Sequence, residues 1–183
     1  MGRARSAIAA QTTIESLREA MLQVFPVELT EEGPECEDFF DAADYCRPHT
    51  EELGGDAGAD AWYFWRQGKW AIAGDLGLSL CRNGAALEEL SKRVGDLVVG
   101  AIDDAFEYAL FAVVVRGEIK RRLTLEDDVC VVEGLPTAAE RGRHLIDFDL
   151  AECEHLWTSH GLPTFDHDPL EGPFKTVALR RKD

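Results

Sequence analysis

A chain of 183 residues, 45% of them hydrophobic, is long and apolar enough to bury a core, which excludes a disordered protein. A formal net charge of −16 opposes nucleic-acid binding, and the longest apolar stretch, 108–115, is far below the ~18 residues of a membrane-spanning helix. The five cysteines form no CxxC pair and follow no secretory signal. We therefore expect a cytoplasmic protein with reduced thiols that binds neither nucleic acid nor membrane.

The first predicted helix covers residues 12–25. Apolar side chains recur there every three or four residues, Thr12 and Glu15 fit a capping box, and Pro26 ends the helix. A short strand is expected at 27–30.

An aromatic hairpin is predicted next. The bulky segments 62–65 and 70–73 flank Gly68, which suits a tight turn, and the aromatic side chains are expected in the core. Leucines alternate with small residues at 76–80, which predicts a further short strand.

The middle of the chain is predicted to form a helix and then an antiparallel run of strands. Residues 84–94 have one apolar face, basic residues near their end, and Gly95 as the stop. Because 108–115 is almost entirely apolar, we expect it to be the most buried of the strands that follow. Turn signals separate these strands at 97–102, 108–115, 119–125 and 129–132.

The last third is predicted to contain one helix and a closing strand. Asp147 or Asp149 is a suitable N-cap for a helix that ends at Gly161, and 176–179 is expected to be an edge strand. Together these elements predict a single α+β domain, residues 1–183, in which helices flank a mostly antiparallel sheet of about five strands.

Residues 31–60 hold eleven acidic side chains against Arg47 alone, and thus ten of the sixteen excess negative charges. One interpretation is a solvated, partly flexible loop that aids solubility. The other is a docking surface for a basic partner, which neighbouring aromatic residues favour because a solubilising loop has no use for them. The predicted partner-binding residues are Glu31, Glu32, Glu35, Glu37, Asp38, Phe39, Phe40, Asp41, Asp44 and Tyr45.

No pattern indicates a catalytic centre, a metal or a cofactor. The chain has no G-x-S-x-G and none of the glycine spacings of phosphate-binding loops. Cys153, His155 and His160 are two and five residues apart, whereas ligands on one helical face are three or four apart. Two acid pairs are interpreted as turn residues and not as a two-carboxylate hydrolase: Asp103 with Asp104, and Asp166 with Asp168.

A family resemblance extends over roughly residues 62–140. It rests on Trp70 and on the segments 87–95, 98–101, 117–122 and 131–136, which together resemble poorly characterised small bacterial proteins. Some of those proteins resemble immunity proteins of contact-dependent or secretion-delivered toxins. The resemblance implies a cytoplasmic protein that binds and neutralises a toxin, without an active site of its own. The competing hypothesis is an enzyme or small-ligand-binding domain with an unrecognised site.

Overall fold

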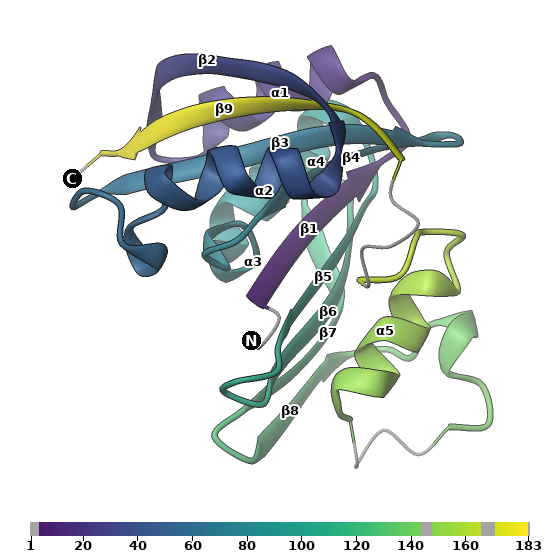
Figure 1. Ribbon diagram of the computed structural model, residues 1–183. Coiled ribbons are helices and arrows are strands. Elements are labelled where there is room, and N and C mark those ends of the chain that lie inside the picture. The colour runs from purple at the N-terminus through teal and green to yellow at the C-terminus, as the bar shows by residue number, and fades with distance from the viewer. Residues whose placement is uncertain (1–3, 144–147, 166–170, 183) are drawn as a thin grey trace.

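The computed structural model describes residues 4–143, 148–165 and 171–182. In this part of the chain, one antiparallel sheet of nine strands has α-helices on both faces (Figure 1). The strands are β1 (Ala4–Ala10), β2 (Val27–Asp38), β3 (Ala59–Gln67), β4 (Trp70–Asp75), β5 (Leu97–Asp103), β6 (Tyr108–Val115), β7 (Glu118–Glu126), β8 (Val129–Gly134) and β9 (Glu171–Arg181). The helices are α1 (Ile14–Val24), α2 (Phe39–Cys46), α3 (Ser79–Arg82), α4 (Gly84–Val94) and α5 (Leu150–Thr158), and short 3₁₀ turns lie at Arg47–His49, Glu51–Leu53 and Ala138–Glu140.

The sheet is larger than expected, and the prediction of about five strands is wrong. Its order is β2-β9-β3-β4-β1-β5-β6-β7-β8, within an α+β fold. The sequence gives little sign of β1, because alanine has a low preference for strands. Ala7, Ala9 and Ala10 are nonetheless buried, since β1 lies between β4 and β5 at the centre of the sheet.

The two faces of the sheet carry separate apolar layers. Met21 of α1 and Leu90 of α4 pack with Phe64 of β3 in one layer. Phe39 of α2 and Trp157 of α5 belong to the other layer. Successive residues of a strand point to opposite faces, so β3 supplies large aromatic side chains to both layers.

Two predicted helices are confirmed, and the N-cap of the first is Thr13 where Thr12 was expected. Helix α1 begins after Thr13, whose hydroxyl accepts the N–H of Ser16 at 3.1 Å. Helix α4 begins after Asn83, whose side-chain oxygen accepts the N–H of Ala86 at 3.0 Å. It ends at Gly95, where φ is +92°, a conformation that favours glycine.

The four predicted strands between residues 97 and 134 are confirmed as the antiparallel run β5-β6-β7-β8. The expectation that 108–115 is the most buried of them is wrong. Every residue of β5 is buried, whereas Val113 and Val115 of β6 are only half-buried. The reason is position, because β5 is paired with the central strand β1 and β6 lies one strand further out.

Two further predictions are corrected by the topology. Residues 76–80 do not form a strand: β4 ends at Asp75, Leu78 adopts a left-handed conformation with φ of +59°, and α3 begins at Ser79. The closing strand is not at an edge either. Strand β9 lies between β2 and β3, because β2 continues to Asp38 and pairs along it.

Candidate functional site

The ten residues predicted to bind a partner lie on β2 and α2, at one edge of the sheet (Figure 1). Eight of them are exposed, and we call these eight the acidic edge: Glu31, Glu32, Glu35, Glu37, Asp38, Phe40, Asp41 and Asp44. The other two, Phe39 and Tyr45, pack inward to different degrees.

The adjacent phenylalanines of α2 differ in burial, although their rings meet edge to face with the ring centres 6.1 Å apart. Asp38 caps the helix by accepting the N–H of Asp41 at 3.0 Å, which fixes the start of the helical repeat. Phe39 is then 2% exposed and belongs to the core, beneath the guanidinium of Arg5 at 4.4 Å from its ring centre. Phe40 is 58% exposed, so it is the aromatic residue of this helix that a partner can contact.

Tyr45 is a packing residue more than a contact residue. Its ring crosses Gly33 of β2, where an added Cβ would lie 2.5 Å from the ring. Its hydroxyl is buried and has no hydrogen-bond partner among the described residues. Burial, together with the neighbouring charge of Glu31, raises the pKa of Tyr45 to about 12, so the phenol stays neutral.

Several charges of the acidic edge are not neutralised within the chain. Arg18 pairs with Glu32, and the Nη1 of Arg47 lies 2.9 Å from the carboxylate of Asp44. In the part of the chain that the structure describes, no cation lies within ion-pair distance of the remaining glutamates and of Asp41: Glu31, Glu35, Glu37 and Asp41.

The backbone of β2 is poorly suited to pair with another strand. Its register with β9 shifts at three places, and Pro34 has no N–H to donate. Bulges, proline and charge are the devices that protect sheet edges from further pairing. A partner at the acidic edge therefore contacts side chains and does not extend the sheet.

A second polar group, which the sequence did not reveal, lies inside the fold. Asp60 of β3 and Asp75 of β4 are 2% and 0% exposed. The hydroxyl oxygen of Ser79 lies 2.7 Å from Oδ2 of Asp60 and 2.8 Å from Oδ2 of Asp75. The backbone N–H of Ser79 also donates to Asp75, and Ser6 of β1 donates to its other oxygen.

This arrangement favours a proton shared between the two carboxyl groups. A hydroxyl carries one proton, so Ser79 donates to only one of the two carboxyl oxygens, and the second contact is a hydrogen bond only if one carboxyl group is protonated. Burial acts in the same direction. It raises the pKa of Asp60, and burial with the nearby charge of Asp60 raises the pKa of Asp75 to about 7.

The shared proton predicts that part of the stability is lost as pH rises. Folded Asp75 keeps its proton to a higher pH than an unfolded aspartate, so between about pH 4 and 7 the folded state binds more protons and the free energy of unfolding falls. Asp75→Asn removes the titrating group and is expected to flatten this fall, by at most ~1.4 kcal/mol per pH unit. Urea unfolding across this range measures it. Asp41→Asn, which changes an exposed acid, is the control, and equal slopes in both variants would contradict the shared proton.

An open cavity of about 250 Å³ lies beside this pair, lined in part by Asp60, Ser79 and Trp62. Arg181 on its wall is held by Glu51 and Glu52, both at 3.0 Å. The cavity is the feature that favours a small-ligand domain. Two observations oppose a ligand site: Asp60 is almost fully covered, and the hydroxyl of Ser79 already contacts both carboxyl groups. The two aspartates and Ser79 therefore connect β3, β4 and α3.

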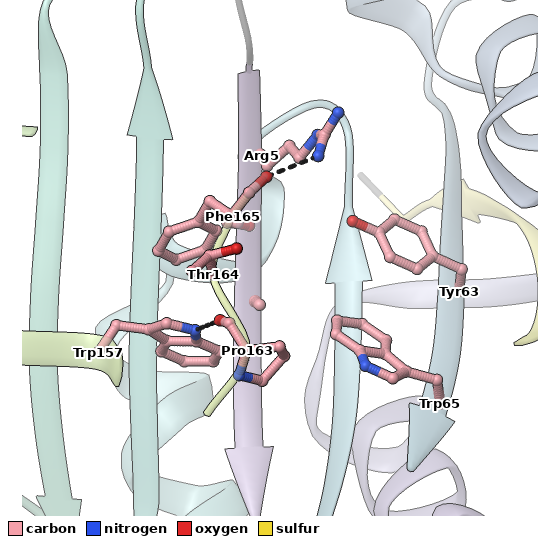
Figure 2. Close-up of a pocket in the computed structure, with 9 residues that line it drawn as sticks. Arg5, Tyr63, Trp65, Trp157, Pro163, Thr164 and Phe165 are labelled. Carbon is pink, nitrogen blue, oxygen red and sulfur yellow. Dashed lines mark hydrogen bonds between the residues drawn. The ribbon is translucent and has the colours of Figure 1, made fainter. Parts of the chain in front are cut away.

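Figure 2 shows a second hollow, a narrow aromatic crevice beside β1. Tyr63 and Trp65 lie on one side and Trp157 and Phe165 on the other, and the guanidinium of Arg5 donates to the carbonyl of Phe165 at 2.9 Å. The space inside is about 10 Å³, room for one water molecule at most. The aromatic residues of the hairpin are buried, which confirms their predicted place in the core.

Cys153 and His155 of α5, and His160 just after it, are not grouped around one point. Cys153 is buried, its sulfur lies 3.4 and 3.1 Å from the carbonyl oxygens of Ala101 and Leu110, and burial raises the pKa of this thiol to about 12. The Nδ1 of His160 instead lies 2.9 Å from the carbonyl of Leu156. Among the described residues, no three His, Cys, Asp or Glu side chains are grouped as a metal site.

The acid pairs considered for hydrolysis are only partly covered by the structure. Asp103 accepts the N–H of Ala105 at 2.9 Å, which is the bonding of a turn residue. Asp166 and Asp168 lie outside the described residues.

Comparison with known proteins identifies no relative: no family model, no curated protein and no solved structure matches this chain. Among the helices of the described residues, none has the length and apolar character needed to cross a bilayer. The function is therefore argued from the geometry of the acidic edge.

Proposed function

We propose that this chain is a non-catalytic protein-binding protein whose acidic edge binds a basic protein. The observation that carries the proposal is Phe40, a large apolar side chain 58% exposed on a helix whose exposed neighbours are acidic. An exposed aromatic residue contributes little to folding, whereas aromatic side chains are frequent anchors of protein interfaces. Phe40 is thus the candidate anchor.

The charges around Phe40 define the partner. Glu37 precedes it by three residues and Asp41 follows it, and neither is paired with a cation among the described residues. Unpaired surface acids accelerate the approach of a positively charged protein and add less to the final affinity. The partner is accordingly basic, and it approaches the α2 side of the edge.

The resemblance of residues 62–140 to immunity-like bacterial proteins supports a specific class of partner. In this proposal the basic protein is a toxin domain, and the chain neutralises it in the cytoplasm by covering its surface. The irregular strand β2 is consistent with binding through side chains. Its bulges and Pro34 disfavour backbone pairing with a partner strand.

Two variants separate charge from anchoring, and the measurement is binding kinetics with a basic toxin domain that a neighbouring gene is found to encode. Changing four acids to amides is expected to slow association and reduce its dependence on salt, because the attraction is screened within ~8 Å at physiological ionic strength: Glu35→Gln, Glu37→Gln, Asp38→Asn and Asp41→Asn. Phe40→Ala is expected to speed dissociation and to cost ~2 kcal/mol or more in affinity.

Phe106→Ala is the matched control for the aromatic change. Phe106 is 78% exposed, and it lies between β5 and β6, which are five and six strands from β2 in the sheet. Its removal should leave both rate constants unchanged. If the acid and Phe40 variants bind and protect as the parent does, the acidic edge is a solubilising surface and the proposal fails.

A further inference from the structure

The two edges of the sheet have opposite properties. Strand β2 has bulges, a proline and a row of acids, which protect an edge from pairing. Strand β8 pairs with β7 without a register shift, and its sequence contains no proline and no lysine. Glu133, near the end of β8, is the one charged residue of this strand, and an even edge with so little charge is a template for another strand.

Apolar side chains are exposed on both faces of β8. Val129 is 59% exposed and Val131 and Val132 are 48% exposed, and Leu135 just beyond the strand is 83% exposed. Because Val131 and Val132 are adjacent in a strand, they lie on opposite faces of the sheet. A strand added at this edge would cover apolar surface on both of its faces.

We propose that β8 pairs antiparallel with β8 of a second copy of this chain, so that the two sheets join into one. The position of the charge favours a second copy as the occupant. Ten of the sixteen excess negative charges lie in residues 31–60, and β2 is eight strands away, or roughly 38 Å at ~4.8 Å per strand in a flat sheet. Pairing through β8 therefore places the two acidic edges at opposite ends of the dimer.

Side-chain charge restricts the register, and we place its centre at Val131. A two-fold axis perpendicular to the sheet keeps each face continuous, so a residue of β8 lies opposite itself. With Val131 opposite Val131 of the second copy, Val129 faces Glu133 and no acid faces an acid. If the two-fold axis passed through Cys130 instead, Glu133 would lie opposite Asp127 of the second copy. Repulsion between like charges disfavours that register.

This dimer leaves both acidic edges open, so it is independent of the proposed function. Salt should also affect the dimer and the proposed complex with a basic protein in opposite directions. Two copies of charge −16 repel, and salt screens that repulsion, so dimerisation should strengthen as ionic strength rises. Binding of a basic protein should weaken under the same change.

Sedimentation equilibrium of the full chain over a range of protein and salt concentrations tests the proposal. The parent is expected to dimerise, and Val131→Lys is expected to raise the dimer dissociation constant at least about tenfold, because two lysines would face each other. Leu53→Lys, the same apolar-to-lysine change at a 46% exposed residue of the 3₁₀ turn Glu51–Leu53, should dimerise as the parent does. Circular dichroism shows that each variant is folded. A parent that is monomeric at every concentration would overturn the proposal.

Cysteine cross-linking tests the register in a Cys130→Ser background. Directly opposite residues have Cα atoms about 4.5–5.5 Å apart, within the range that a disulfide bridges. Val131→Cys should therefore form a covalent dimer on mild oxidation. Val129→Cys should not, because the two copies of residue 129 would be separated by about 14 Å, four residues along the strand. Cross-linking through residue 129 in preference to 131 would overturn the proposed pairing.

Discussion

Glu140→Ala is expected to lower the free energy of unfolding by about 3–5 kcal/mol, the usual effect of removing one partner of a buried ion pair. Arg121 of β7 is 3% exposed and Glu140 is 4% exposed. The Nε of Arg121 lies 3.0 Å from the Glu140 carboxylate, and its Nη1 donates to the carbonyl of Gly134 at 2.9 Å. The same carboxylate accepts the N–H of Thr137 at 2.8 Å.

The cost arises from the charge that is left behind. Without Glu140 the guanidinium stays buried with only carbonyl oxygens to accept its protons, and the segment after β8 loses its attachment to β7. Replacing both members, as Arg121→Met with Glu140→Leu, removes the charges together and should recover most of the lost stability.

Urea unfolding followed by circular dichroism measures these differences. Glu118→Ala is the matched control, because the ion pair of Glu118 with Lys120 is exposed to solvent and such pairs contribute between 0 and about 1 kcal/mol. An effect of Glu140→Ala no larger than that of Glu118→Ala would show that the buried pair is not a determinant of stability.

What the sequence predicts well depends on short-range signals. Helices α1 and α4 were predictable because a polar cap, an apolar face and a stop residue all lie within a dozen residues. The run β5 to β8 was predictable for the same reason, since each turn is adjacent to the strands it connects. The place of a strand within the sheet has no such local signal, so the central strand β1 was missed and β9 was wrongly expected at an edge.

The buried carboxyl group shows the same limit at the level of a site. Ser6, Asp60, Asp75 and Ser79 come from three strands and a helix, and only the pairing of β1, β3 and β4 brings them together. By contrast, the sequence does contain a signal for the burial of Phe39 and the exposure of Phe40. With Asp38 as the cap, the inward positions at three-to-four spacing are Phe39, Ala42, Ala43 and Cys46, which leaves Phe40 outside.

Trp157→Ala is expected to lower the free energy of unfolding by about 3–5 kcal/mol, as truncation of a fully buried aromatic side chain does. Trp157 is 1% exposed, its ring stacks on Phe165 with the ring centres 5.2 Å apart, and its indole N–H donates to the carbonyl of Pro163 at 2.6 Å. It therefore attaches α5 and the segment after it to the sheet. Trp157→Phe keeps most of the bulk and should cost less.

Gly100 of β5 makes this prediction more specific. An added Cβ at Gly100 would lie 2.8 Å from the ring of Trp157 and 2.7 Å from that of Phe165, so Gly100→Ala alone should destabilise by about 1–3 kcal/mol through overpacking. Once Trp157 is truncated, Phe165, which stacks on it, can move into the vacated space, so the same methyl group should cost less. Unfolding free energies of the two single variants and the double variant give the coupling directly. Additive effects would mean that Trp157 does not rest on Gly100, and that α5 is held to the sheet by other contacts.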